Sequence, residues 1–376
     1  AAIESCVLLK NDYNKLPLHL DTIENLAIIG PLADDGFEQL GTWTFDGKPE
    51  WSQTPLQAIR AMVGDQVNIH VAKGLETTRT KNRDGFEAAL AAAKKSDTVI
   101  MFMGEEAILS GEAHCRADID LPGYQNELLE AISKLGKSTV LVIMAGRPLT
   151  LTQTQTYTNA LLYAWHPGTM GGPAIADLLF GKAYPTGKLP VTFPKMVGQI
   201  PIYYNQRHSG KPATHESFTY IDDIPSRAFQ TSVGNTSFHL DAGFEPLYPF
   251  GFGLSYTHFH YHGIWLNTDT IQMQDTLEVY AELSNAGGRE GIEIAQLYIR
   301  DLVGSITRPV KELKGFQRVH LQPGESKTIV FHLPTDNLAF HTRKGQWTSE
   351  PGQFEVWVGG DSTTALKTTF HLHADA

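Results

Sequence analysis

The chain has 376 residues, which is too many for one ordinary hydrophobic core, so two or three domains are expected. Its formal net charge of −11 argues against nucleic-acid and anionic-lipid partners, because both require clustered Lys and Arg side chains. No apolar run approaches the roughly 18 residues of a membrane-spanning helix. We therefore expect no membrane partner and a neutral ligand.

The chain contains two cysteines, Cys6 and Cys115. Two thiols this far apart form neither a disulfide framework nor a zinc motif, so we expect both to be unpaired and buried. The sequence also lacks the spacing of a metal site, a phosphate-binding glycine loop or a nucleophile elbow, and no metal or cofactor is expected. The N-terminal segment AAIESCVLLKND has no signal-peptide pattern and begins without Met, which suggests a chain cut from a longer one.

Residues 26–204 alternate short apolar runs with segments of helical spacing. We expect strands at residues 26–30, 67–72, 98–104, 138–146 and 159–166. We expect helices at residues 54–63, 84–95, 124–136 and 172–181. Thr54 is a suitable N-cap before Pro55, and Gly136 is a suitable helix terminator. Continuous apolar strands alternating with helices predict an α/β domain, in which helices cover both faces of a mostly parallel sheet.

The periodicity changes in the second half of the chain. Residues 205–255 are rich in Tyr, Pro, Gly, Ser and His without a sustained period, which predicts an irregular but ordered connecting segment. From residue 256 the apolar residues alternate. Strands are expected at residues 276–285, 291–301, 327–334 and 352–360, and the AGGRE turn between the first two predicts a hairpin. Residues 256–376 therefore predict an all-β, fibronectin type III-like sandwich.

Ligands of an open parallel sheet bind beyond the carboxyl ends of its strands. The expected strand that ends at Gly104 is followed by GEEAILSGEAHCRADIDLPG, which is too long for an ordinary strand-to-helix connection. The charged residues of this loop are Glu105, Glu106, Glu112, Arg116, Asp118 and Asp120. A long loop rich in carboxylates at the binding edge of a sheet is a suitable place for a catalytic acid or base.

Residue chemistry alone also fits a solvated acidic loop held by one ion pair, for example Arg116 with Glu105. Arg147, at another strand end, fits either a contact with the loop or substrate or a structural anchor. For His166, structural packing is the favoured interpretation. The alternating residues His258, His260 and His262 could bind a metal, but we interpret them as a solvated strand face.

The loop SGEAHCRADIDLPG, preceded by FMGE, resembles the corresponding loop of family-3 glycoside hydrolases of the bacterial periplasmic β-glucosidase type. The pattern in those enzymes is close to G-E…(S/H)-E-A-x-S-R-x-x-(I/L)-x-(L/I)-P. The resemblance continues, in the order of the family, through ESCVLLKND, GRPL, AWHPGTMGGPAIADLLFGKAYPTGKLPVTFP, IPIYYNQ, PLYPFGFGLSYTHFHY, SNAGGREGIEIAQLYIRD, RPVKELKGF and LQPGES. It therefore covers the whole chain.

The resemblance implies roles for three residues. Glu112 matches the family's general acid/base. Glu105 matches the other Glu of the pattern and is expected to order the loop or the site. Arg116 matches the Arg of the pattern and is expected to pair with a carboxylate and hold the loop in place. Arg147 is included with Glu105 and Arg116 as a loop-ordering or substrate-binding residue because of its position at a strand end. Cys115 stands where the pattern usually has Ser, and the effect of that difference on Glu112 stays open.

The resemblance also implies a retaining mechanism, whose nucleophile is an Asp on an N-terminal (β/α)8 barrel. The family's G-(F/L)-(V/I)-(V/M)-S-D-like segment does not occur in this sequence. Residues 1–25 are accordingly interpreted as a linker from a missing barrel, and the chain alone is expected to be inactive. The expected protein partner is a barrel domain, in cis or in a second chain, and a homodimer is left open.

The activity that the resemblance implies is that of an exo-acting β-glucosidase on oligosaccharides or β-glucosides, in the periplasm or outside the cell. A β-xylosidase or arabinosidase of the same family is the alternative enzyme. A non-catalytic carbohydrate-binding or assembly module is the alternative from another functional class.

Overall fold

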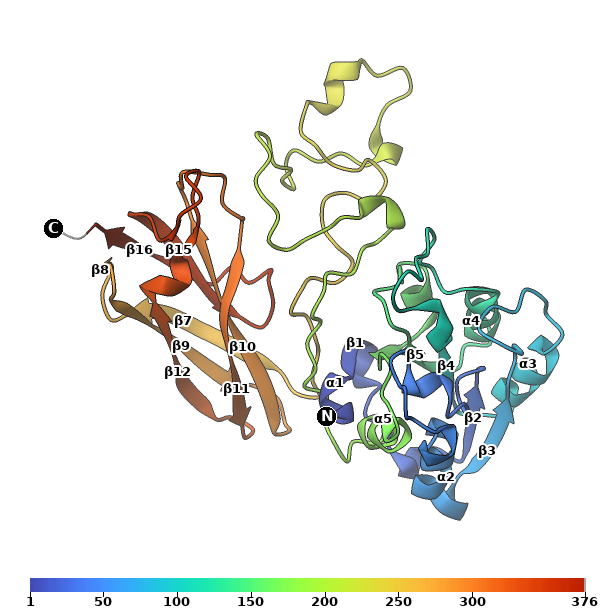
Figure 1. Ribbon diagram of the computed structural model, residues 1–376. Helices are drawn as coiled ribbons and strands as arrows, with labels where there is room; N and C mark the ends of the chain where they lie inside the picture. Colours follow the sequence, from blue (N-terminus) through green and yellow to red (C-terminus); the bar gives the residue numbers. More distant parts are fainter. Residues whose placement is uncertain (375–376) are drawn as a thin grey trace. The chain divides into compact units, whose positions relative to one another are not determined.

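A six-stranded sheet lies at the centre of the N-terminal unit, with the strand order β1-β6-β5-β4-β2-β3. The computed structural model describes residues 1–374 (Figure 1). The strands of this sheet are β1 (Val7–Asn11), β2 (Asn25–Ile29), β3 (Asn68–Ala72), β4 (Thr98–Gly104), β5 (Ser138–Met144) and β6 (Ala160–Tyr163). The helices are α1 (Ala2–Ser5), α2 (Pro55–Val63), α3 (Phe86–Lys94), α4 (Gln125–Ser133) and α5 (Gly171–Leu179). All neighbouring strands are parallel except β1 and β6, so the predicted mostly parallel α/β sheet is confirmed.

The apolar runs of the sequence explain the centre of this sheet. Every residue of β4 is buried, and so is every residue of β5 after Ser138. Ile28 and Phe102 on the sheet pack in one cluster with Ile59 of α2 and Ile175 of α5. Helices α2 and α5 contact each other, as do α3 and α4, so the helices cover the sheet in two pairs. Strands buried in this way have no polar face, which is why they read as continuous apolar segments.

Helix α2 begins where the sequence predicts it. The Thr54 hydroxyl accepts a hydrogen bond from Gln57 N, the Gln57 side chain accepts one from Thr54 N, and Pro55 occupies the first helical position. This reciprocal capping satisfies backbone donors that have no partner within the helix. After α4, Gly136 adopts the left-handed conformation at φ +67°, where a glycine terminates the segment without steric cost.

The structure corrects the interpretation of residues 1–25 as a linker. Val7, Leu8 and Leu9 are buried, and β1 pairs antiparallel with β6 as the edge strand of the sheet. The physical reason is the short apolar run VLL, because its burial against the sheet edge gives more stabilising free energy than a solvated linker would.

Cys6 is buried beside this strand, as expected, but Cys115 is exposed on the long loop. Both thiols are free, so their lack of pairing is confirmed while the burial of Cys115 is not.

The second unit is a sandwich of two sheets, with the strand orders β11-β10-β15-β16-β8 and β12-β9-β7. Its strands are β7 (Phe259–Leu266), β8 (Thr270–Gln272), β9 (Thr276–Asn285), β10 (Gly291–Asp301), β11 (Glu312–Leu321), β12 (Ser326–Pro334), β15 (Gly352–Gly359) and β16 (Lys367–His373), and a small ribbon holds β13 (Phe340–His341) and β14 (Trp347–Thr348). Alternate residues such as Val279, Leu297 and Val356 form one core between the two sheets. The predicted fibronectin type III-like sandwich is therefore confirmed.

The AGGRE turn does not form the predicted hairpin. Strand β9 pairs with β12 and β7, whereas β10 pairs with β11 and β15, so the turn carries the chain from one sheet to the other. Asn285 supports this crossing, because its Nδ2 donates to Arg289 O (2.7 Å) and to Leu321 O (3.1 Å). The alternation of apolar residues is the same on both strands because both face one core, and this pattern does not reveal which sheet a strand joins.

The irregular middle of the chain groups with the second unit. Residues 198–252 belong to it, whereas residues 1–189, 193–197 and 253–256 form the first unit, so the boundaries differ from the predicted 26–204 and 205–255. Val310 N donates to Gln206 O (2.8 Å), which ties the segment to the strand entering β11. Phe218 packs edge-on against Tyr220 and Phe238, which supplies part of a local apolar cluster.

Candidate active site

The long loop lies beyond the carboxyl end of β4, where the sequence predicts it. Gly104 has φ +142°, and a Cβ on this residue would lie only 1.8 Å from Met144 O, so the chain leaves the strand in a path that only glycine permits. The amide of Gln125, the first residue of α4, bonds both the N–H and the carbonyl of Gly104 at 2.8 Å and also donates to Pro122 O (3.0 Å). The two ends of the loop are therefore held by one buried side chain.

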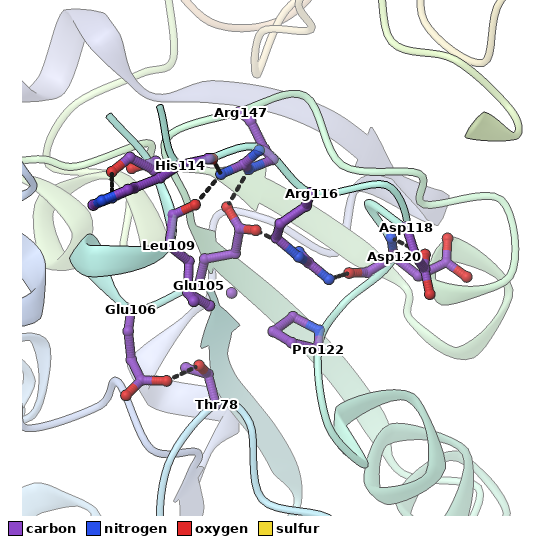
Figure 2. Close-up of polar contacts among 12 residues, drawn as sticks. Thr78, Glu105, Glu106, Leu109, His114, Arg116, Asp118, Asp120, Pro122 and Arg147 are labelled. Atoms are coloured by element: carbon purple, nitrogen blue, oxygen red, sulfur yellow. Dashed lines mark hydrogen bonds and ion pairs between the residues drawn. The ribbon is translucent and has the colours of Figure 1, made fainter. Parts of the chain in front are cut away.

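Glu105 is the centre of the loop's charge network (Figure 2). Its side chain has no exposed surface, and each carboxylate oxygen faces a different guanidinium. Arg116 Nη1 donates to Oε1, and Arg147 Nε donates to Oε2 at 3.0 Å. A carboxylate removed from water in this way is stable only while its cationic partners remain in place. The predicted pairing of Arg116 with a carboxylate is thus present in the structure.

The same two arginines extend the network to the backbone of the loop. Arg147 Nη2 donates to Leu109 O and to His114 O (2.9 Å), while Arg116 Nη2 donates to Asp120 O (2.9 Å). The backbone is consequently fixed on both sides of the turn that carries Glu112. Arg147 acts as an anchor of the loop, one of the two interpretations that the sequence left open.

A second carboxylate network holds the base of the loop. Glu106 accepts hydrogen bonds from Arg79 Nε (2.7 Å), Arg79 Nη2 (3.0 Å) and the Thr78 hydroxyl (2.7 Å). The hydrogen bond from Arg79 is the main reason why the pKa of Glu106 lies below its usual value. Near this pair, Glu38 accepts a hydrogen bond from Ala107 N (2.5 Å), and burial raises the pKa of the Glu38 carboxyl. Sequence reasoning named Glu106 as a loop residue but missed its partners Thr78 and Arg79, and it missed Glu38, because no local pattern links these three residues to the loop.

Glu112 itself is exposed at the tip of the loop. Its neighbours Gly111 and Ala113 both have positive φ, at +106° and +64°, and the latter is uncommon for a residue with a Cβ. Among residues 1–374, no side chain forms a hydrogen bond or ion pair with the Glu112 carboxylate. The loop therefore presents this carboxylate to solvent, while the charges beneath it are paired.

His166 lies where three strand-end loops meet. Its Nε2 is 3.4 Å from the Ser110 hydroxyl of the long loop. A Cβ on Gly41 would approach the imidazole to 2.9 Å, and a Cβ on Gly146 would lie 3.0 Å from its Nε2. Burial is the main reason why the pKa of His166 is lowered, so the ring favours the neutral form. His166 therefore has the expected packing role. Its ring lies against the loops that follow β2, β4 and β5.

The remaining acidic residues of the loop shape its backbone. Asp118 Oδ1 accepts from Asp120 N (2.9 Å), and Asp120 Oδ1 accepts from the Thr150 hydroxyl.

Across residues 1–374 there is no group of three or more His, Cys, Asp and Glu side chains arranged to hold a metal ion. Of the three alternating histidines, His260 and His262 lie on β7 and stack on each other, and His262 Nε2 lies 2.6 Å from the Ser284 hydroxyl. In the same range, no helix is both long and apolar enough to cross a membrane.

Comparison with known proteins agrees with this architecture. A family model for the glycosyl hydrolase family 3 C-terminal domain matches residues 6–256, and one for a fibronectin type III-like domain matches residues 293–362. The periplasmic β-glucosidase of Salmonella typhimurium is 38% identical over 99% of this chain and 49% of its own length. A β-xylosidase of Formosa agariphila is 36% identical over 96% of this chain and 47% of its own.

A solved structure gives the same correspondence. The β-glucosidase of Listeria innocua, crystallised in complex with isofagomine, superposes with a TM-score of 0.88 at 33% identity, covering 100% of this chain and 49% of that one. The chain spans about half the length of the curated relatives and of the solved enzyme that it matches.

Proposed function

Because this chain belongs to glycosyl hydrolase family 3, we propose that it supplies the general acid/base of a retaining β-glycosidase and that Glu112 is that residue. The observation that carries the proposal is the contrast between two glutamates of one loop. Glu105 is buried and bonded to two arginines, whereas Glu112 is exposed and free of such partners. A proton donor must reach the glycosidic oxygen of its substrate, and only a carboxyl group at the surface of the loop has that access.

The chemistry requires a second carboxylate. In a retaining enzyme a nucleophile lies about 5–5.5 Å from the acid/base and forms a covalent glycosyl-enzyme intermediate. We propose that this nucleophile is provided by a barrel domain, in the same polypeptide or in a second chain. Glu112 first protonates the leaving oxygen and then, as a carboxylate, removes a proton from the attacking water. Under this proposal the isolated residues 1–376 fold but do not turn over substrate.

Arg116 and Arg147 are positioning residues in this proposal. They contact Glu105 and the loop backbone, and the 17–18% of their side chains that is exposed leaves little surface for substrate. Their role is to hold the turn at Glu112 at a fixed height above the sheet edge. Accurate placement matters because proton transfer requires heavy atoms within hydrogen-bonding distance.

The proposed substrates are terminal β-linked glucosides, including oligosaccharides. Support comes from the Salmonella relative and from the Listeria enzyme, which has been solved in complex with isofagomine and with glucose. A β-xyloside is the second candidate, because the Formosa relative is a β-xylosidase of nearly equal identity. The name of the Salmonella enzyme likewise supports a periplasmic or extracellular location.

Leaving-group dependence tests the role of Glu112. In the barrel-containing enzyme, Glu112→Ala should slow cleavage of β-glucosides with poor leaving groups by about 10²–10⁴-fold. It should slow formation of the intermediate much less for a nitrophenyl glucoside, since that leaving group needs little protonation. Equal losses for both substrates would contradict the proposal.

The mass of the native polypeptide distinguishes an enzyme with a barrel in cis from a non-catalytic carbohydrate-binding or assembly module.

A further inference from the structure

The turn that precedes Glu112 is also held from the loop that follows β2. In this loop, Glu38 and Thr42 both bond the backbone of Ala107, at the start of the turn. Glu38 accepts a hydrogen bond from Ala107 N (2.5 Å), and the Thr42 hydroxyl donates one to Ala107 O (2.5 Å). Ala107 is buried, so water cannot readily replace these partners. Both backbone polar groups of Ala107 are therefore fixed by one segment of the β2–α2 loop.

The Thr42 hydroxyl also reaches the other end of the turn. Its Oγ1 lies 3.0 Å from the Ser110 hydroxyl and 3.2 Å from Ser110 O. Ser110 is buried, and its hydroxyl lies in turn 3.3 Å from Ala107 O and 3.4 Å from His166 Nε2. A single threonine hydroxyl thus connects the two ends of the turn, from Ala107 to Ser110.

The methyl group of Thr42 faces the residue directly before Glu112. Gly111 has φ +106°, and a Cβ on this residue would lie only 2.5 Å from Thr42 Cγ2. The methyl group thus occupies the space beside Gly111, and the backbone there cannot move toward Thr42 without meeting it. Thr42 therefore places two constraints on the chain that leads into Glu112, a hydroxyl bonded to the turn and a methyl group packed beside Gly111.

We propose that Thr42 is a positioning residue for the acid/base, an inference that rests on the role proposed for Glu112. Arg147 bonds Leu109 O and His114 O and so holds the loop from the end of β5, while Thr42 holds it from the end of β2 (Figure 2). Proton transfer requires heavy atoms at hydrogen-bonding distance, and a displacement of about 1 Å can cost about 10²-fold in rate. Loss of the Thr42 hydroxyl should therefore impair protonation of the leaving group.

Leaving-group dependence in the barrel-containing enzyme tests this role. Thr42→Val removes the hydroxyl and keeps a similar shape, so kcat/KM should fall about tenfold for an alkyl β-glucoside, whose leaving group needs protonation. For a nitrophenyl β-glucoside, which needs little protonation, the loss should stay within about twofold. Thr42→Ser keeps the hydroxyl and should retain most of the activity toward the alkyl glucoside. The matched control is Thr44→Val, because the Thr44 hydroxyl donates to Gly41 O (3.2 Å) in its own loop rather than to the turn.

A double variant separates an effect through Glu112 from a general disturbance of the fold. In the Glu112→Ala background, Thr42→Val should cause no further loss with the alkyl glucoside, because no proton donor remains to be placed. A further loss of similar size in that background, or equal losses for both glucosides in Thr42→Val alone, would overturn the inference. So would a Thr42→Val enzyme as active as Thr44→Val. If Glu112→Ala itself slows both glucosides equally, it is the proposed function that fails, which distinguishes the two cases.

Discussion

Arg147 donates its Nε hydrogen to Oε2 of Glu105 over 3.0 Å, and the same guanidinium holds the carbonyl oxygens of Leu109 and His114. One side chain thus connects the end of β5, the end of β4 and the backbone on both sides of the turn that carries Glu112. We therefore expect the position of the exposed Glu112 carboxylate to depend on the buried Glu105.

Replacing the buried carboxylate should destabilise the α/β unit. Glu105→Gln leaves Arg116 and Arg147 without a counter-charge in a site that is largely closed to water, and we expect a loss of about 3–5 kcal/mol in the free energy of unfolding. Denaturant titration followed by circular dichroism measures this. Glu76→Gln is the control, because the Lys73–Glu76 pair is exposed and its loss should be close to neutral. Similar stability of the two variants would show that Glu105 does not hold the loop.

The Glu106–Arg79 pair should give the stability an acid-dependent component. The folded pKa of Glu106 is lowered, chiefly by Arg79, so the pair stabilises the fold at pH values above the unfolded pKa of about 4.3. Its contribution should disappear as the pH falls through the folded pKa. Arg79→Ala should therefore reduce the free energy of unfolding by about 1 kcal/mol at pH 7 and by nothing at low pH. A difference that stays constant across this range would contradict the pairing.

His166 should produce a separate pH dependence. Its folded pKa is lowered by burial, so between about pH 6.5 and the folded value the unfolded chain binds a proton that the folded chain does not. Stability should fall as the pH decreases through this window, by up to about 1.4 kcal/mol per pH unit for a single proton. His166→Leu should remove this part of the slope while leaving the other histidines unchanged. Parallel slopes for variant and wild type would mean that His166 is not protected from protonation.

How much of this could be read from the sequence depends on the range of each interaction. The apolar run of β4 and the capping of α2 by Thr54 are local, and both were predicted. The crossing after Asn285 and the pairing of β1 depend on partners far along the chain, and for these the predictions were wrong. The packing role of His166 was predicted, but the loops that it contacts, like the pairing of Arg79 with Glu106, depend on segments that meet only in the folded sheet. The motif containing Glu112 identified the loop, but its pattern does not show which glutamate is buried.

The two cysteines should differ sharply in reactivity. Cys6 is buried and its pKa is raised to about 12, whereas Cys115 is exposed on the loop. Because the thiolate is the reactive form, a thiol reagent should label one site per native chain and two per unfolded chain. Cys115→Ser should abolish labelling of the native protein. Persistent labelling of that variant would indicate that the edge of the sheet around β1 opens readily.

Azide rescue of Glu112→Ala in the barrel-containing enzyme tests the central claim most directly. The variant should accumulate a glycosyl-enzyme from a nitrophenyl β-glucoside, because its deglycosylation lacks a base. Azide needs no deprotonation, so it should restore turnover and yield the β-glycosyl azide, while Glu105→Gln should not be rescued in this way. Glycosyl azide formed only by Glu112→Ala is the result that the account predicts. Normal hydrolysis by Glu112→Ala, or no effect of azide on a folded variant, would contradict it.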